Sequence, residues 1–181
     1  MTYPVSYDHN FRLFVPKQAT GANLVYFDLF NAAGSGRKLA ISSIQPVVSG
    51  AVAVTGVVGV DLFLTRTTAV GTGGTAATFK GTDTTACTIS TVQAEHGNLI
   101  STVTARLTPT GGATAGAVLT WASVFTEETS SGAYMGKCVD FIYIGKDPED
   151  IIIPEGTGIR IVQGAVASVG NIGFNVAFAL I

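Results

Sequence analysis

The segment PEDIIIPEGTGIRIVQG, residues 148–164, decides the fold of this 181-residue chain. It places three isoleucines before Pro154 and a Gly-x-Gly after it, which fits either a nucleotide-binding loop or a bend between two buried strands. A dinucleotide loop requires Gly-x-Gly-x-x-Gly between a strand and a helix, whereas the position three residues after Gly158 is Ile161, which continues a strand-like alternation. Pro154 and Gly156 are typical of a tight turn. The segment therefore predicts strand, turn and strand, and no phosphate site.

The rest of the chain also predicts strands. Thr, Val, Ile and Phe are frequent, Gly recurs, and no long amphipathic helix pattern is present. Residues 57–67 (VVGVDLFLTRT) alternate with a period of two, and residues 171–181 (NIGFNVAFALI) place bulky side chains on one face and small ones on the other. About ten short strands joined by turns predict an all-β fold, an antiparallel two-sheet sandwich of jelly-roll-like type.

One predicted strand is apolar on both faces. Residues 23–30 (NLVYFDLF) carry Asp28 as their only charged residue. A strand of this kind has its outer face covered, either by its own chain or by a partner. In a later predicted strand, Pro46 indicates a sheet edge or a bend, because proline cannot donate a hydrogen bond to a neighbouring strand.

The chain length fits a single domain. We expect residues 1–20 to form an extended N-terminal arm and residues 21–181 to form one β-sandwich domain. Within it, the Gly- and Thr-rich stretch from Thr68 to Thr88 predicts a long ordered loop with one short strand at Ala77 to Lys80.

Charge is scarce in this sequence. Charged residues make up 12% of the chain, against about 25% in a typical soluble domain. This shortage predicts a soluble subunit whose surface is partly covered in an assembly. The net charge of −2 and the scattered basic residues favour no nucleic acid partner. No secretory leader is evident, and the apolar run Gly50–Leu64 falls short of the roughly 20 residues that span a bilayer, so no membrane partner is expected.

The candidate catalytic residues are two acid–histidine pairs, Asp8–His9 and Glu95–His96. Adjacent residues on an extended strand point to opposite faces, so neither carboxylate would orient its neighbouring imidazole. A Gly-x-Ser-x-Gly elbow is also absent from the sequence. The sequence therefore predicts no catalytic residues and no enzyme.

No cofactor and no metal are expected. Cys87 and Cys138 lie too far apart for a compact ligand motif, and we expect reduced, buried thiols. An acidic group comprises Asp147, Glu149, Asp150 and Glu155. Its spacing differs from that of a calcium-binding loop, which favours a solvated acidic turn over a calcium site.

Three aromatic residues, Trp121, Tyr134 and Tyr143, suggest a platform for stacking sugars. The alternative is that Trp121, within the apolar run VLTWASVF, packs in the core. The apolar neighbours of Trp121 favour the core.

Four stretches taken in order resemble a known group of proteins. They are LFLTRTTAVGTGGTAATFKGTD (62–83), VFTEETSSG (124–132), IIIPEGTGIRIVQG (151–164) and the closing NVAFALI. They resemble small β-sandwich structural proteins of tailed bacteriophages. The resemblance implies a virion component, a capsid decoration or cement protein or a head or tail accessory protein, and it brings no catalytic residues.

We therefore expect a non-enzymatic virion protein that binds the major capsid protein or another virion protein as a homo-oligomer, with a trimer expected. The expected partner-binding residues are Tyr3, Tyr7, Phe11 and Phe14, because the N-terminal segment has more aromatic residues than a free tail would carry. The alternative is that these side chains pack onto the domain's own sheet. The alternative function is a carbohydrate- or receptor-binding module that uses the loop Thr68–Thr88 and exposed tyrosines.

Overall fold

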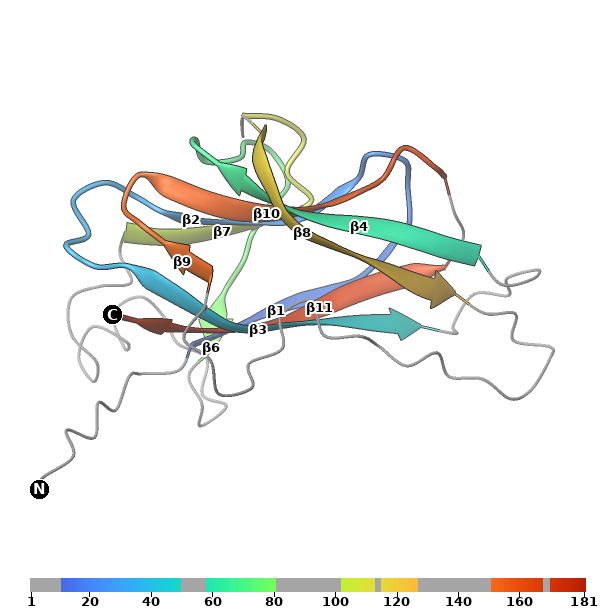
Figure 1. The fold of residues 1–181 in the computed structure, drawn as a ribbon, viewed down its shortest axis with the longest axis horizontal. Coiled ribbons are helices and arrows are strands. Elements are labelled where there is room, and N and C mark those ends of the chain that lie inside the picture. Colours follow the sequence, from blue (N-terminus) through green and yellow to red (C-terminus); the bar gives the residue numbers. More distant parts are fainter. Residues whose placement is uncertain (1–10, 50–57, 81–101, 113–114, 127–150, 168–169) are drawn as a thin grey trace, which may run out of the picture.

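The chain folds into two antiparallel β-sheets that pack face to face (Figure 1). The computed structural model describes residues 11–49, 58–80, 102–112, 115–126, 151–167 and 170–181. The strands are β1 (Phe11–Ala19), β2 (Val25–Asn31), β3 (Leu39–Ser49), β4 (Val58–Thr67), β5 (Thr75–Ala76), β6 (Phe79–Lys80), β7 (Val103–Leu107), β8 (Ala115–Thr126), β9 (Ile151–Ile153), β10 (Thr157–Gln163) and β11 (Asn171–Leu180). The predicted all-β sandwich is confirmed.

The strand order is that of a jelly roll with an insertion. The first sheet has the order β6-β1-β11-β3-β9, and the second has the order β5-β7-β2-β10-β4-β8. When β5, β6 and β7 are set aside, two four-stranded sheets remain, β1-β11-β3-β9 and β2-β10-β4-β8. This arrangement of eight strands, built from two Greek keys, is the jelly roll. The inserted strands β5 to β7 lie between β4 and β8 in the chain.

The core lies between the sheets and follows the predicted alternation. Leu62 and Leu64 of β4 and Phe174 and Phe178 of β11 are all 1% exposed or less. Aromatic rings join across the core, with centroids of Phe27 and Phe174 5.8 Å apart in an edge-to-face arrangement. Edge-to-face ring pairs of this kind stabilise a core beyond their buried area.

The turn at residues 154–156 connects the two sheets. It joins β9, at the edge of the first sheet, to β10, in the interior of the second. Gly156 has a φ of 70°, and its N–H donates to the Asn31 carbonyl at 2.8 Å. The predicted strand, turn and strand are confirmed, and the two strands belong to different sheets rather than to one hairpin.

Pro46 lies where β3 has a neighbour on one side only. It is opposite Phe174 of β11, whereas β9 pairs with β3 only at Leu39–Ile41. Within the described residues, the other side of β3 at Pro46 is therefore unpaired, as the sequence predicts for a proline in a strand.

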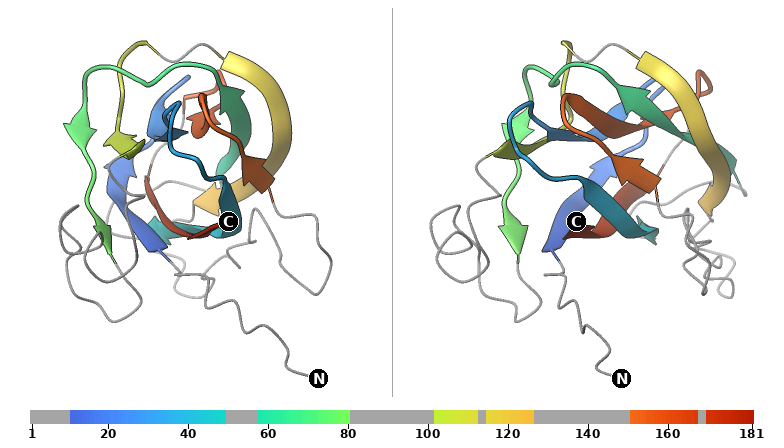
Figure 2. Two further views of the ribbon diagram at one scale, coloured as in Figure 1. Left: turned by 90° about the vertical axis from the view of Figure 1, so that its left-hand side faces the viewer. Right: turned by 60° about the vertical axis from the view of Figure 1, so that its left-hand side comes forward.

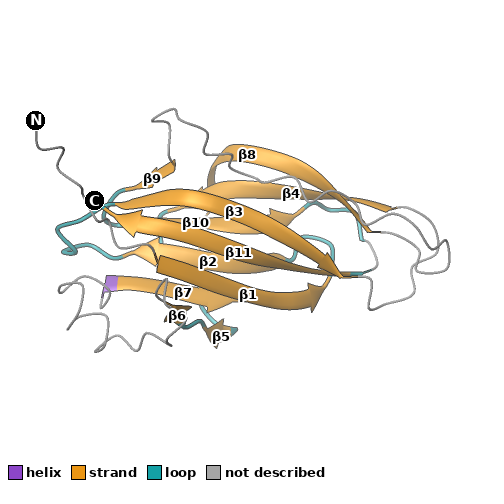
Figure 3. Cartoon of the chain, turned by 90° about the horizontal axis from the view of Figure 1, so that it is seen from below, coloured by secondary structure: helices purple, strands orange, loops and turns teal. Residues whose placement is uncertain are grey.

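The expected N-terminal arm is wrong for residues 11–19. These residues form β1, which pairs with β11 on one side and with β6 on the other (Figure 3). Phe11, Leu13 and Val15 are each 1% exposed and belong to the core. The apolar alternation of Phe11, Leu13 and Val15 is the signal for a strand. Residues 1–10 lie outside the described part of the chain.

The insertion closes one side of the sandwich. The predicted loop Thr68–Thr88 contains β5, which pairs with β7 at the edge of the second sheet, and β6, which pairs with β1 at the edge of the first. Figure 2 shows this green segment running along one side from one sheet to the other. The short strand expected at residues 77–80 is found at Phe79–Lys80, and residues 81–88 lie outside the described range. Covering an edge in this way blocks unwanted strand pairing.

Candidate functional site

The outer face of the second sheet holds a buried carboxylate. Asp28 of β2 points away from the core and is nevertheless 1% exposed. The N–H of Gly71 donates to its Oδ2 at 2.8 Å. The connections on either side of the inserted strands cross above this face, and they pair with each other at Thr72 and Gly111 (Figure 1). The chain itself therefore provides cover for β2, one of the two alternatives that its sequence predicts.

Two arginines flank Asp28 on neighbouring strands. Arg106 of β7 and Arg160 of β10 are both directly opposite it in the sheet. Burial raises the pKa of the Asp28 carboxyl above its ordinary value, while the Gly71 hydrogen bond and the charges of Arg160 and Arg106 act to lower it. Its Oδ1 atom is buried without a hydrogen-bond partner. Burial is thus the largest influence on this group.

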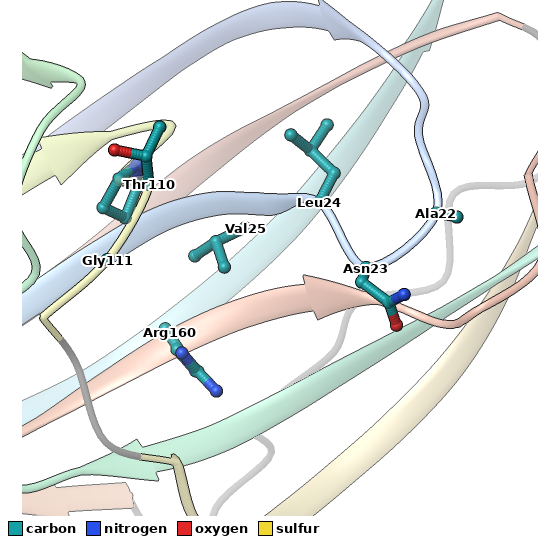
Figure 4. Close-up of a pocket in the computed structure, with 8 residues that line it drawn as sticks. Ala22, Asn23, Leu24, Val25, Thr110, Gly111 and Arg160 are labelled. Carbon is teal, nitrogen blue, oxygen red and sulfur yellow. The ribbon is translucent and has the colours of Figure 1, made fainter.

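A pocket of about 370 Å³ opens next to Arg160 (Figure 4). Its lining residues are Ala22, Asn23, Leu24, Val25, Pro109, Thr110, Gly111 and Arg160. Figure 4 places Val25 and Arg160 on neighbouring strands, with Thr110 on one side and Asn23 on the other. The Nε of Arg160 donates to Thr65 Oγ1 at 3.3 Å. The pocket thus combines apolar side chains with guanidinium, amide and hydroxyl groups.

An apolar row runs from this pocket across four strands. In register, Val25 of β2 is opposite Val162 of β10, Val162 is opposite Phe63 of β4, and Phe63 is opposite Trp121 of β8. We call these four residues the Val25–Trp121 row. The first three side chains are half-buried, and Trp121 is 62% exposed.

The prediction that Trp121 packs in the core is wrong. In β8, Thr120, Ala122 and Val124 are opposite the core-facing residues Leu64, Leu62 and Val60. Trp121 is in the opposite phase and therefore faces outward. The run VLTWASVF is apolar at both phases, so its sequence alone does not indicate which face is buried.

A polar pair borders the row beside Phe63 and Trp121. Asp61 and Ser123 are opposite each other, and the Ser123 hydroxyl donates to Asp61 Oδ1. Gly164 lies close to both Asp61 and Phe63, and its N–H donates to the Asp61 carbonyl at 2.8 Å. The absence of a side chain at Gly164 keeps Asp61 and Phe63 accessible.

The outer face of the first sheet carries a single exposed large apolar side chain among its described residues. Phe14 of β1 is 55% exposed. It is opposite Asn175 of β11, and the outward positions on either side of Asn175 are Gly173 and Ala177. Phe14 therefore projects above the smaller side chains of β11 beside it.

The four expected partner-binding residues have different outcomes. Phe14 is exposed, whereas Phe11 is 1% exposed and stacks on Phe178 with ring centroids 5.6 Å apart. Phe11 is a core residue, so its expected role in partner binding is wrong. Tyr3 and Tyr7 lie outside the described residues.

Most other candidate residues also lie outside the described part of the chain. These are Asp8, His9, Cys87, Glu95, His96, Tyr134, Cys138, Tyr143, Asp147, Glu149 and Asp150. Glu155 is described: it is exposed, and its Oε2 accepts a hydrogen bond from the Gly34 N–H at 2.9 Å. This bond gives Glu155 a structural role beside the turn.

Within the described residues, no group of three or more His, Cys, Asp or Glu side chains could hold a metal ion. The same residues include no helix that is long and apolar enough to cross a membrane. Comparisons of the chain with protein-family models, with curated proteins and with solved structures found no match.

Proposed function

We propose that this chain is a non-enzymatic virion structural protein, a capsid decoration or cement protein. It binds the major capsid protein or another virion protein and works as a homo-oligomer, a trimer. The observation that carries this proposal is Phe14, a large aromatic side chain that is 55% exposed, whereas Phe11, Leu13 and Val15 of the same strand are buried. Jelly rolls are common in viral capsids, which supports the proposal as an analogy of fold alone.

The surface around Phe14 suits close contact with another protein. Its outward neighbours on β11, Gly173, Asn175 and Ala177, are small or uncharged. Binding energy at protein interfaces is concentrated in a few aromatic or arginine side chains surrounded by near-neutral contacts. The scarcity of charge, 12% of residues, points the same way, because charged residues are depleted from interface cores.

A particle-binding assay tests this proposal. Purified protein is added to virions stripped of it, and the bound fraction is measured by sedimentation. We expect Phe14→Ala to weaken binding by about tenfold or more, the effect of losing a central aromatic contact. Val166→Ala is the matched control, because Val166 is 72% exposed at the β10–β11 connection. Equal binding of wild type and Phe14→Ala would refute the role of this face.

Exposure of Trp121 favours a second candidate function, a carbohydrate- or receptor-binding module. An indole that is 62% exposed beside the polar pair Asp61–Ser123 is a suitable surface for a ligand with both apolar and hydroxyl groups. Because Trp121 and Phe14 lie on opposite faces of the sandwich, one subunit can use Phe14 for assembly and Trp121 for a ligand.

A further inference from the structure

We propose that a linear oligosaccharide binds along the Val25–Trp121 row, with one end at the Arg160 pocket and the other on the Trp121 indole. The proposal rests on the second candidate function and assigns its ligand class and its site. It concerns the outer face of the second sheet and is independent of the contact at Phe14.

The row has the dimensions of a short oligosaccharide. Neighbouring strands lie about 4.8 Å apart, so four side chains in register across β2, β10, β4 and β8 span about 14 Å. Within the row, Val25, Val162 and Phe63 are half-buried and Trp121 projects, while Val118 of β8, 55% exposed and opposite Thr65, lies beside the Trp121 end. The row is therefore a narrow strip with a raised aromatic end.

Polar groups flank the strip on both sides. Arg160 and Thr65 lie on one side of the strip, two positions along their strands from the row, and they are joined by a hydrogen bond. Asp61 and Ser123 lie on the other side, also two positions from the row, and they are hydrogen-bonded to each other. Each sugar hydroxyl can both donate and accept, so hydroxyls on one edge can accept from Arg160 and those on the other edge can donate to Asp61, which keeps acceptor capacity beyond the one bond from Ser123.

A pyranose chain matches this pattern. Its rings have apolar C–H faces, which pack on aromatic and aliphatic side chains, and hydroxyl groups around their edges, which reach flanking polar groups. A protein partner fits less well, because a stable protein interface needs about 800 Å² on each side, much more than the area of the row with Val118 beside it. The arrangement therefore favours a saccharide.

The test uses Trp121 as its reporter, because it is the only tryptophan in the chain. Cellotriose, chitotriose and maltotriose are titrated into the full-length protein while Trp121 fluorescence is recorded, and a glycan array extends the panel. We expect a saturable change with at least one of these sugars. Isothermal titration calorimetry then compares Trp121→Ala, Asp61→Asn and the control Phe14→Ala, whose side chain lies on the other sheet.

We expect Trp121→Ala to lower affinity by more than tenfold, Asp61→Asn to lower it by about tenfold, and Phe14→Ala to leave it unchanged. A sugar that binds equally well to Trp121→Ala would overturn this site and leave the second candidate function standing. The absence of binding on the array and in calorimetry, with wild-type protein shown to be folded by circular dichroism, would overturn both. Neither result would affect particle binding through Phe14.

Discussion

The carboxylate of Asp28 accepts a hydrogen bond from the Gly71 N–H at 2.8 Å. This bond attaches the connection between β4 and β5 to the outer face of the second sheet. The two residues are 43 positions apart in the chain, and their bond is buried. Gly71 also has no room for a side chain, since an added Cβ would lie 2.8 Å from Asp28 Oδ2 and 2.9 Å from Pro109 Cβ. This contact positions the wall of the Arg160 pocket, because Pro109 and Gly111 belong to the connection that pairs with residue 72.

Removal of the Asp28 carboxylate is expected to destabilise the fold. In Asp28→Ala the Gly71 N–H loses its acceptor, which costs about 1–3 kcal/mol for a buried group. In Asp28→Asn the side-chain carbonyl still accepts this bond, so we expect a smaller loss or none. Urea denaturation at pH 7 measures both variants, and an equal loss in the two would contradict this role for the hydrogen bond.

The same residue predicts a pH dependence of stability. Because burial raises the pKa of Asp28 above the usual 3.8, the folded protein keeps this proton at pH values where the unfolded chain has lost it. The contribution of Asp28 to the free energy of unfolding is therefore greatest below about pH 4, and it falls as the pH rises through the pKa of Asp28 in the folded protein. We expect the stability of Asp28→Asn relative to wild type to increase between about pH 4 and pH 7. Parallel pH profiles for the two proteins would show that Asp28 does not contribute.

The buried amide of Gln163 connects two parts of the chain. Its Oε1 accepts hydrogen bonds from the Tyr26 hydroxyl at 2.8 Å and from the Gly21 N–H at 2.9 Å. We expect Tyr26→Phe to cost about 1 kcal/mol and Gln163→Leu about 2–3 kcal/mol, because the second change leaves two donors unsatisfied. Chemical denaturation of both single variants and the double variant measures the coupling, and the double variant should lose less than the sum. Additive losses would mean that the Tyr26–Gln163 bond contributes little.

The second glycine of the Gly-x-Gly, Gly158 of β10, is explained by packing. An added Cβ at Gly158 would lie 2.5 Å from the Leu29 carbonyl oxygen and 2.6 Å from Thr67 Oγ1, so no side chain fits there. We expect Gly158→Ala to lower the free energy of unfolding by about 1–3 kcal/mol. Gly21→Ala is the control, because its nearest neighbour would be Leu24 Cβ at 3.8 Å, and it should change stability by less than about 0.5 kcal/mol. A neutral Gly158→Ala would contradict the packing explanation.

Assembly predicts a defined mass in solution. Light scattering across a dilution series should give three times the 18.6 kDa chain mass at every concentration. Phe14→Ala should lower that mass if Phe14 contacts a second copy, and should leave it unchanged if Phe14 contacts only the capsid. A wild-type mass of one chain at all concentrations would contradict the proposed homo-oligomer.

Much of the fold could be predicted from periodicity. The alternation in β4 and β11 correctly indicates their buried faces, and the Pro154–Gly156 turn is correctly placed between strands. These signals are strong because each strand has one clearly apolar face. Alternation specifies faces and not neighbours, so it does not indicate that β9 and β10 belong to different sheets.

The site could be predicted much less well. Trp121 lies in a strand that is apolar at both phases, and only its register with β4 determines that it faces outward. Phe11 and Phe14 are alike in sequence, but their odd spacing places them on opposite faces of β1, one in the core and one exposed. The Val25–Trp121 row joins residues from four strands that are distant in the chain, and no local sequence signal predicts it.

The most direct test of the virion proposal is the protein content of the particle. Under this proposal a phage or prophage encodes the chain, so virions from that source are purified on a density gradient and examined by quantitative mass spectrometry and by immunogold labelling. We predict that the protein is present in many copies, in a fixed ratio to the major capsid protein, with label on the particle surface. Particles that lack the protein, from cells that produce it, would contradict the proposal.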